Sequence, residues 1–168
     1  MPDSARLEKA APMVDTYVID PPAIAALPVA GSDQWFPVHR VYCVGRNYAA
    51  HAVEMGHDPN KEPPFFFQKN PDNLDTSGEF PYPPASKIGH PSQGAVWLDV
   101  NGERKQTGDL NQMIWKVPEM ISYLSGLFRL APGDIIMSGT PAGVGAVKRG
   151  EVLKGHVDGV GDIEVRVV

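Results

Sequence analysis

Hydrophobic residues recur along this chain with two different periods. Between residues 114 and 128 they return every three or four positions, which predicts an amphipathic helix. Two compact apolar runs, RVYCVG at 40–45 and PPFFFQKN at 63–70, are bounded by glycine or proline and predict buried strands. Residue polarity alternates on both sides of Asn101-Gly102, and because this pair favours the type I′ turn, the segment predicts a β-hairpin.

Shorter signals complete the expected order of elements. The alanine-rich segment 47–56 predicts a helix with Asn47 as its cap and Gly56 at its end. The run IIMSG predicts a strand that leads into the glycine-rich loop SGTPAGVG, and the tail predicts short strands around an Asp158-Gly159 turn. Strands outnumber helices and hairpins dominate, so the expected fold class is α+β, mainly β, with a mainly antiparallel sheet.

The chain divides into two parts of different composition. Residues 1–37 are rich in alanine and proline, lack sustained periodicity and indicate an extended arm. Residues 38–168 are expected to form one domain, since a chain of 168 residues is long enough to bury a real core. No apolar run approaches the ~20 residues of a membrane span. The N-terminus also lacks the zones of a signal peptide.

Charge and cysteine usage narrow the class of protein further. The formal net charge is −5 and no cluster of Lys and Arg is present, so nucleic acid is not an expected partner. Cys43 is the single cysteine, which excludes an internal disulfide and favours the reducing cytoplasm. An anionic small molecule would need a local cation, and Arg46 and Lys69 are the candidates.

His51 and Glu54 form the main candidate for acid–base chemistry. They stand at i and i+3 of the expected helix, so their side chains share one face. A carboxylate can then hold one imidazole nitrogen while the other takes a proton, which suits a general base near neutral pH. The alternative interpretation is an ordinary surface ion pair on an exposed helix.

Other residues have structural interpretations beside functional ones. Lys69 ends an apolar strand and is commonly a snorkelling surface residue in such a place. The loop SGTPAGVG misses both nucleotide-binding glycine patterns, so it is either a tight turn that brings backbone N–H groups near a ligand or a plain loop. Cys43 lies inside a buried run and is expected to be a core residue. The remaining histidines have no metal-site spacing and are treated as structural: His39, His57, His90 and His156.

Six segments, taken in order, resemble the fumarylacetoacetate hydrolase family. They are VYCVGRNYAAHAVEMG, PPFFFQK, YPPASK, VWLDVNGERKQTGDLNQMIW, VPEMISYLSGLFRLAPGDIIMSGTPAGVG and GHVDGVGDIEVRV, and they cover nearly everything from about Val38 onward. The most specific parts are GRNYxxHxxE and GDIIxSGTPAGVG. Within the family, the segment 55–69 and the hairpin are most similar to bacterial hydrolases of fumarylpyruvate in the gentisate route.

The resemblance implies a mixed β-roll with a few helices, a homodimer and a divalent metal, Mg²⁺ or Mn²⁺. It implies that His51 and Glu54 activate water and that Lys69 polarises or positions that water. The implied substrate-binding residues are Arg46 and Tyr48 at the cavity mouth and Thr140 of the glycine-rich loop.

One part of the family's pattern is absent from this sequence. After YPPASK the family continues with a Glu-x-Glu pair and a later Asp that together hold the metal, whereas here YPPASK runs into IGHPSQGAVWLDV at Lys87–Ile88. No replacement trio of carboxylates appears, so no metal ligand is assigned. Two explanations are open: either the protein has several dozen residues that this sequence lacks, or the deletion is genuine.

The implied reaction is hydrolysis of fumarylpyruvate, a dioxo acid, to fumarate and pyruvate. His51 would take the proton of the attacking water, and Arg46 would pair with a substrate carboxylate. Three alternatives remain: an acylpyruvase, an oxaloacetate decarboxylase or isomerase-decarboxylase of the same family, and a metal-free inactive paralogue that only binds. Retention of the His51–Glu54 pair favours hydrolysis over decarboxylation.

Overall fold

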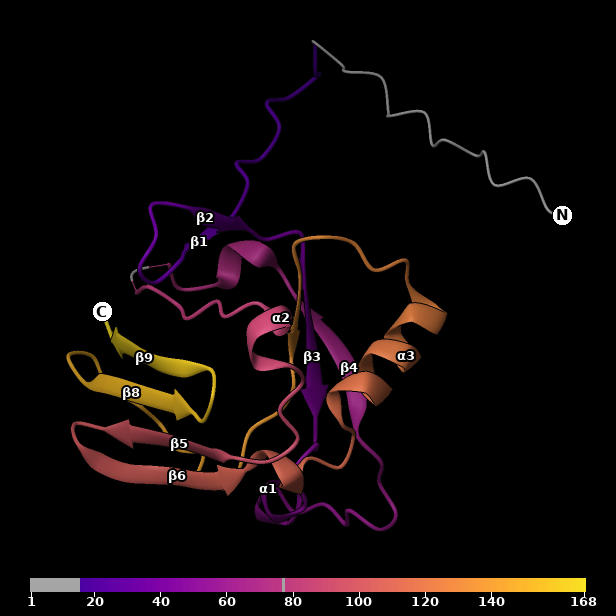
Figure 1. Ribbon diagram of the computed structural model, residues 1–168, viewed down its shortest axis with the longest axis vertical. Helices are drawn as coiled ribbons and strands as arrows, with labels where there is room; N and C mark the ends of the chain where they lie inside the picture. The colour runs from indigo at the N-terminus through magenta and orange to yellow at the C-terminus, as the bar shows by residue number, and fades with distance from the viewer. Residues whose placement is uncertain (1–15, 77) are drawn as a thin grey trace, which may run out of the picture.

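The structure is a computed structural model that describes residues 16–76 and 78–168. The described residues form nine strands, three α-helices and two short 3₁₀ helices (Figure 1). The strands are β1 (Ala26–Pro28), β2 (Trp35–Pro37), β3 (Arg40–Gly45), β4 (Phe65–Lys69), β5 (Ala95–Val100), β6 (Glu103–Asp109), β7 (Asp134–Met137), β8 (Val152–Val157) and β9 (Gly161–Arg166). The helices are α1 (Ala49–Glu54), α2 (Ala85–Ile88), α3 (Val117–Leu127), η1 (Pro71–Asn73) and η2 (Leu110–Gln112).

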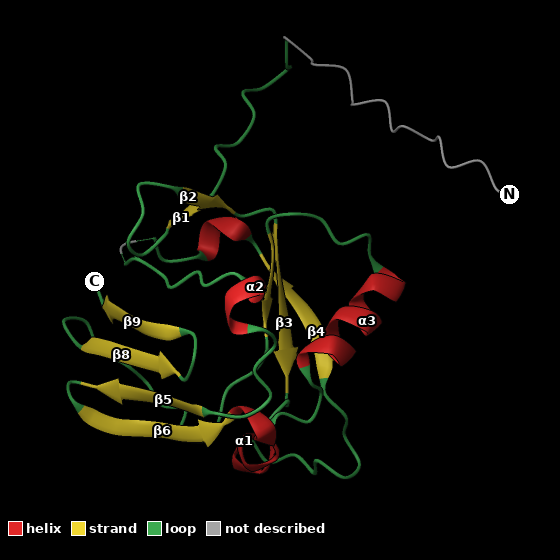
Figure 2. Cartoon of the chain, in the orientation of Figure 1, coloured by secondary structure: helices red, strands yellow, loops and turns green. Residues whose placement is uncertain are grey.

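The strands form three separate sheets. A two-stranded sheet pairs β1 with β2, a three-stranded sheet has the order β4-β3-β7, and a four-stranded sheet has the order β6-β5-β8-β9. The four-stranded sheet is antiparallel throughout, whereas β3 runs antiparallel to β4 and parallel to β7. The predicted α+β class, mainly β with mixed strand directions, is confirmed, and Figure 2 shows how little of the chain is helical.

The two apolar runs became strands of different burial. β3 lies in the middle of its sheet, and the four residues 41–44 are all buried. Among the described strands β4 pairs only with β3, so it is an edge strand, and Phe65 and Phe67 are 44% and 40% exposed. The prediction that this second run is buried is therefore wrong, because β4 lies at the edge of its sheet and four of its five residues are exposed.

The turn signals in the sequence were reliable. Asn101 and Gly102 have φ values of 53° and 80°, as the predicted type I′ turn between β5 and β6 requires. Gly159 has a φ of 74° in the turn between β8 and β9. Gly56 has a φ of 82° directly after α1, which confirms that this glycine ends the helix.

Asn47 does not cap α1 as predicted, because Tyr48 holds the cap position without a side-chain hydrogen bond. Asn47 is 1% exposed, and its amide spans two other segments of the chain. Its Nδ2 donates to the carbonyl oxygens of Trp115 (3.0 Å) and Ser138 (2.7 Å), and its Oδ1 accepts from the Trp115 N–H at 2.6 Å. The amide satisfies backbone groups that burial would otherwise leave unpaired.

The predicted amphipathic helix is α3, which begins at Val117 rather than at 114. Met120 and Leu124 are buried on its inner face. The helix lies alongside β3 and β4 (Figure 1), and the ring of Tyr123 lies 5.6 Å from that of Phe66 on β4. This contact joins the helix to the sheet that carries the candidate site.

Part of the expected N-terminal arm is ordered as a hairpin. β1 and β2 lie within the segment 1–37, and residues from both pack against the buried side chains of Val38, Val41 and Cys43. The first 15 residues of the predicted arm lie outside the described residues. Where the sequence joins YPPASK to IGHPSQ, the chain forms the single turn α2.

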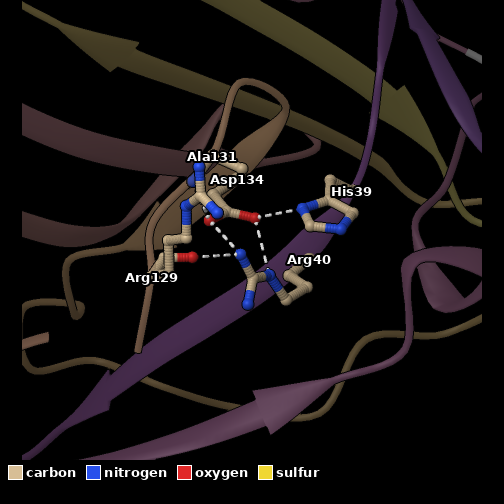
Figure 3. A network of polar contacts seen from close by, with 5 residues as sticks. All are labelled: His39, Arg40, Arg129, Ala131 and Asp134. Atoms are coloured by element: carbon tan, nitrogen blue, oxygen red, sulfur yellow. Dashed lines mark hydrogen bonds and ion pairs between the residues drawn. The ribbon is translucent and has the colours of Figure 1, made fainter. Parts of the chain in front are cut away.

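An ion-pair network fastens β3 to β7 at one end of their parallel pairing (Figure 3). Asp134 accepts hydrogen bonds from His39 Nδ1 and Arg40 Nε, both at 2.9 Å, and from the backbone N–H of Ala131 at 2.8 Å. Arg40 also donates to the carbonyl of Arg129 at 2.7 Å. Burial raises the pKa of the Asp134 carboxyl, but the hydrogen bonds, first of all the one from Arg40, outweigh it and lower that pKa.

Among the described residues, no helix is long and apolar enough to cross a bilayer.

Candidate active site

A pocket of about 480 Å³ gathers four of the six predicted site residues. They come from the end of β3, from α1, from the end of β4 and from the loop after β7, and they are Arg46, His51, Lys69 and Thr140. A larger pocket of about 690 Å³ lies beside His39 and Pro132, but none of the predicted site residues lines it. The smaller pocket is therefore the candidate site.

His51 and Glu54 are paired as their spacing predicts. The distance from His51 Nδ1 to Glu54 Oε2 is 3.1 Å, and their side chains are 17% and 33% exposed. Because Nδ1 is engaged by the carboxylate, Nε2 is the ring nitrogen that can take a proton. His51 lines the pocket, whereas Glu54 does not.

The glycine-rich loop holds Glu54 in place. The backbone N–H of Gly143 donates to Glu54 Oε1 at 2.9 Å. The hydrogen bond from His51, followed by that from Gly143, lowers the pKa of Glu54, so the carboxylate stays charged beside the imidazole. The loop SGTPAGVG thus presents a backbone N–H group, but to the carboxylate of the His–Glu pair, and its predicted approach to a ligand stays a prediction.

Gly143 is suited to this position for two reasons. Its φ is 102°, in the region that favours glycine, and a Cβ there would lie 2.0 Å from the carbonyl oxygen of Lys105 on β6. The loop can therefore lie directly on β6 and still reach Glu54. The sequence pattern of the loop does not identify the acceptor, because Glu54 lies 89 positions away.

Arg46 is paired within the chain. Its Nη1 contacts a carboxylate oxygen of Glu62 closely and lies 3.3 Å from His57 Nδ1, and its guanidinium lies 4.8 Å above the ring of Phe65. The Asp58 N–H is the first cause of the lowered pKa of Glu62, and His57 and Arg46 lower it as well. No sequence pattern marks Glu62, and only the fold reveals that it is the partner of Arg46.

Lys69 is exposed, as expected of a surface lysine, and it also lines the pocket. Its role toward the attacking water stays a prediction. Cys43, two residues along β3 from the register partner of Lys69, is 8% exposed and lines the same pocket. Burial raises the pKa of the Cys43 thiol, an effect that the charge of Lys69 partly offsets. A buried, protonated thiol is a core residue, as expected.

Thr140 and Tyr48 occupy different surroundings. Thr140 lines the pocket, and its Oγ1 lies 2.8 Å from Nε2 of Gln106. Tyr48 was expected at the cavity mouth, but it is 3% exposed in a core cluster with Val44 and Met120 and does not line the pocket. Burial raises the pKa of Tyr48. The backbone of Tyr48 also bridges to Met113 in the segment before α3.

The described residues do not fit the metal site that the resemblance implies. Within residues 16–76 and 78–168, no group of three or more His, Cys, Asp or Glu side chains could hold a metal ion. Mg²⁺ and Mn²⁺ are held by oxygen ligands, and the family's pattern supplies three carboxylates for this purpose. No step of the chemistry below is therefore assigned to a metal.

Comparison with known proteins places the chain in a family. Residues 73–168 match the domain described as "Fumarylacetoacetate (FAA) hydrolase C-terminal". A crystal structure of fumarylpyruvate hydrolase from Pseudomonas aeruginosa, in complex with Mn²⁺ and pyruvate, is 36% identical with a TM-score of 0.79, and the alignment covers 91% of this chain and 99% of that one. The chain belongs to the fumarylacetoacetate hydrolase family.

Two curated relatives carry different activities in their names. A fumarylpyruvate hydrolase of Ralstonia sp is 47% identical over 75 residues, which are 45% of this chain and 39% of that protein. The mitochondrial oxaloacetate tautomerase FAHD1 of Arabidopsis thaliana is 27% identical and aligns with 76% of this chain and 90% of its own length. That alignment runs over 201 positions, more than the 168 residues of this chain, so it includes positions that this chain lacks.

Proposed function

We propose that the chain hydrolyses a carbon–carbon bond in a small dioxo acid and that fumarylpyruvate is its substrate. The observation that carries this proposal is the single pocket that gathers a carboxylate-held histidine, a lysine, an arginine and a threonine hydroxyl. The similarity to the Pseudomonas fumarylpyruvate hydrolase, whose structure contains pyruvate, supports this choice of substrate.

In the proposed reaction His51 acts as the general base. Nε2 takes a proton from water while the water oxygen forms a bond to the substrate carbonyl carbon, and Glu54 stabilises the resulting imidazolium. A base of this kind typically contributes ~10²–10⁴ in rate. The carbon–carbon bond then breaks, and its electron pair leaves on the pyruvate fragment as an enolate.

The proton held by His51 completes the balance. It returns to the enolate carbon, so the imidazole is neutral again. The second proton of the water, left on the new carboxyl group, is lost to solvent, so that fumarate and pyruvate leave. Lys69 and the hydroxyl of Thr140 line the pocket and are the groups proposed to stabilise negative charge on the substrate oxygens. Arg46 now contacts Glu62, and a substrate carboxylate would take the place of Glu62 when it binds to Arg46.

A second function is supported by a specific observation. Because the described residues hold no set of metal ligands, the chain is also a candidate for a paralogue that binds dioxo acids without turning them over.

The homodimer and the cytoplasmic location stay predictions. Sedimentation of the purified chain would measure its oligomeric state.

A side-by-side assay separates these functions. Fumarylpyruvate, acetylpyruvate and oxaloacetate are each supplied with Mn²⁺, with Mg²⁺ and after chelation, and kcat/KM is measured for each combination. We expect fumarylpyruvate to give the highest value. Preferential turnover of oxaloacetate would instead identify a decarboxylase or tautomerase. Binding of pyruvate by calorimetry, without turnover of any of the three substrates, would identify the binding paralogue.

A further inference from the structure

Gln106 does not line the candidate pocket, but it contacts Thr140, a residue that does. It is 9% exposed on β6, opposite Leu98 of β5. Its Nε2 lies 2.8 Å from Thr140 Oγ1 and 2.7 Å from the carbonyl oxygen of Pro141. Nothing in the motifs singled out in the sequence assigns a role to this residue.

The orientation of the Gln106 amide follows from its partners. The Pro141 oxygen belongs to a carbonyl and only accepts hydrogen bonds, so the amide nitrogen, and not the amide oxygen, must face it. The same nitrogen has a second hydrogen, and Thr140 Oγ1 is the acceptor within reach. The hydroxyl of Thr140 is therefore an acceptor on the Gln106 side.

This arrangement leaves the Thr140 hydrogen free for the pocket. A hydroxyl carries one hydrogen and two lone pairs, and the bond from Gln106 uses a lone pair. Thr140 lines both the pocket of about 480 Å³, with His51 and Lys69, and the neighbouring pocket of about 380 Å³, whereas Gln106 lines only the second of these two. Thr140 thus stands between the amide and the candidate site.

We infer that Gln106 is a positioning residue that fixes Thr140 as a hydrogen-bond donor to an anionic oxygen in the candidate site. Without the amide, the Pro141 carbonyl loses the donor that Gln106 supplies. The Thr140 hydroxyl can then rotate and donate to that carbonyl instead of to the pocket. The inference rests on the proposed function, because it deepens the role of Thr140 toward a carboxylate or enolate oxygen. A fixed donor needs no reorganisation when the anion arrives.

The test measures anion binding, so it does not depend on turnover. Oxalate, a planar dianion, is titrated into the full chain by calorimetry, and Gln106→Met is compared with the unaltered protein. The methionine has a similar length and no donor. We expect oxalate to bind about ten times more weakly to the variant, as the loss of a hydrogen bond to a charged group predicts.

A double-mutant cycle separates positioning from general damage. In the Thr140→Val background, Gln106→Met should leave oxalate affinity unchanged, because the hydroxyl that it positions is gone. An equal loss in both backgrounds would overturn the inference, as would unaltered affinity in Gln106→Met alone. If the methionine variant does not fold, Gln106→Asn, which withdraws the amide by one methylene, replaces it in the same cycle.

A second substitution reverses the polarity at the same place. Gln106→Glu presents a carboxylate that captures the Thr140 hydrogen, so oxalate should bind more weakly than to Gln106→Met. Thr107→Glu adds the same charge one residue further along β6 at an exposed position and should have little effect. If both glutamate variants weaken binding equally, charge alone explains the loss and the inference is wrong.

The inference and the proposed function can fail separately. If the unaltered chain hydrolyses fumarylpyruvate but does not bind oxalate, the role of Gln106 is wrong and the reaction stands. If it binds oxalate with the expected dependence on Gln106 but turns over no substrate, the positioning role stands and the hydrolase proposal fails.

Discussion

The backbone N–H of Gly143 donates a hydrogen bond of 2.9 Å to Oε1 of Glu54, although the two residues lie 89 positions apart. The other oxygen of the same carboxylate contacts His51 at 3.1 Å. Glu54 is thus held from two sides, and the imidazole that it orients faces the pocket. The glycine-rich loop and the His–Glu pair, two separate motifs in the sequence, form one unit in the fold.

Replacing His51 by alanine should lower kcat on fumarylpyruvate at least about a hundredfold, because the general base is lost. Oxalate affinity should change by less than about threefold, since the imidazole is assigned to water and not to the anion. His90→Ala, at an exposed histidine in the loop before β5, is the matched control. Near-normal turnover in His51→Ala would remove the base from the mechanism.

Gly143→Ala should both destabilise the protein and slow the reaction. The added Cβ would meet the Lys105 carbonyl at 2.0 Å at a φ of 102°, so the loop must move away from Glu54. We expect a loss of about 2 kcal/mol in the free energy of unfolding and about a tenfold lower kcat.

Gly145→Ala provides the control for that substitution in the same loop. A Cβ at Gly145 would meet nothing within 4 Å, so both stability and kcat should stay within error of the unaltered chain. Chemical denaturation and steady-state assays give the two numbers. If the two alanine variants have the same stability and the same kcat, the contact between the loop and Glu54 does not contribute to catalysis.

The ion pairs of His156 should stabilise the protein at low pH and lose this effect as pH rises. Its Nε2 contacts Asp158 at 2.8 Å and its Nδ1 contacts Asp162 at 2.5 Å, and these two carboxylates raise the pKa of His156. A raised folded-state pKa means that the stabilisation is complete below the unfolded value of about 6.5 and is lost as pH rises through the folded value.

The measurement is the thermal midpoint between about pH 6 and pH 9, a range in which carboxylates stay ionised. The unaltered chain should melt at a lower temperature at the upper end, and His156→Gln should remove most of that dependence. His90→Gln, at the exposed histidine, should leave the slope in place. A slope that is unchanged in His156→Gln would assign the effect to other groups.

Cys43→Ala should retain activity. Cys43 is 8% exposed and burial raises the pKa of its thiol, so little thiolate exists near neutral pH. The mechanism also gives a thiol no step. Lost packing should lower the thermal midpoint by a few degrees. Modification by iodoacetamide should be slow in the folded chain and fast in denaturant. Loss of turnover in Cys43→Ala with an intact fold would reopen a nucleophilic role.

Local sequence determined the elements whose geometry depends on near neighbours. The turn at Asn101-Gly102 follows from residues that tolerate positive φ, and the inner face of α3 follows from spacing alone. The contact between His51 and Glu54 also belongs here, because one turn of helix brings positions i and i+3 together. In each case a few residues close together in the sequence determine the local geometry.

Only the tertiary structure decided the contacts that close over long stretches of chain. Asn47 is available as a helix cap by its type, but it is buried where three backbone groups need partners, so it serves those groups instead. The acceptor for Gly143 and the role of Gln106 depend on which strand lies under the glycine-rich loop. Burial makes such polar pairings necessary, and burial depends on how distant segments pack.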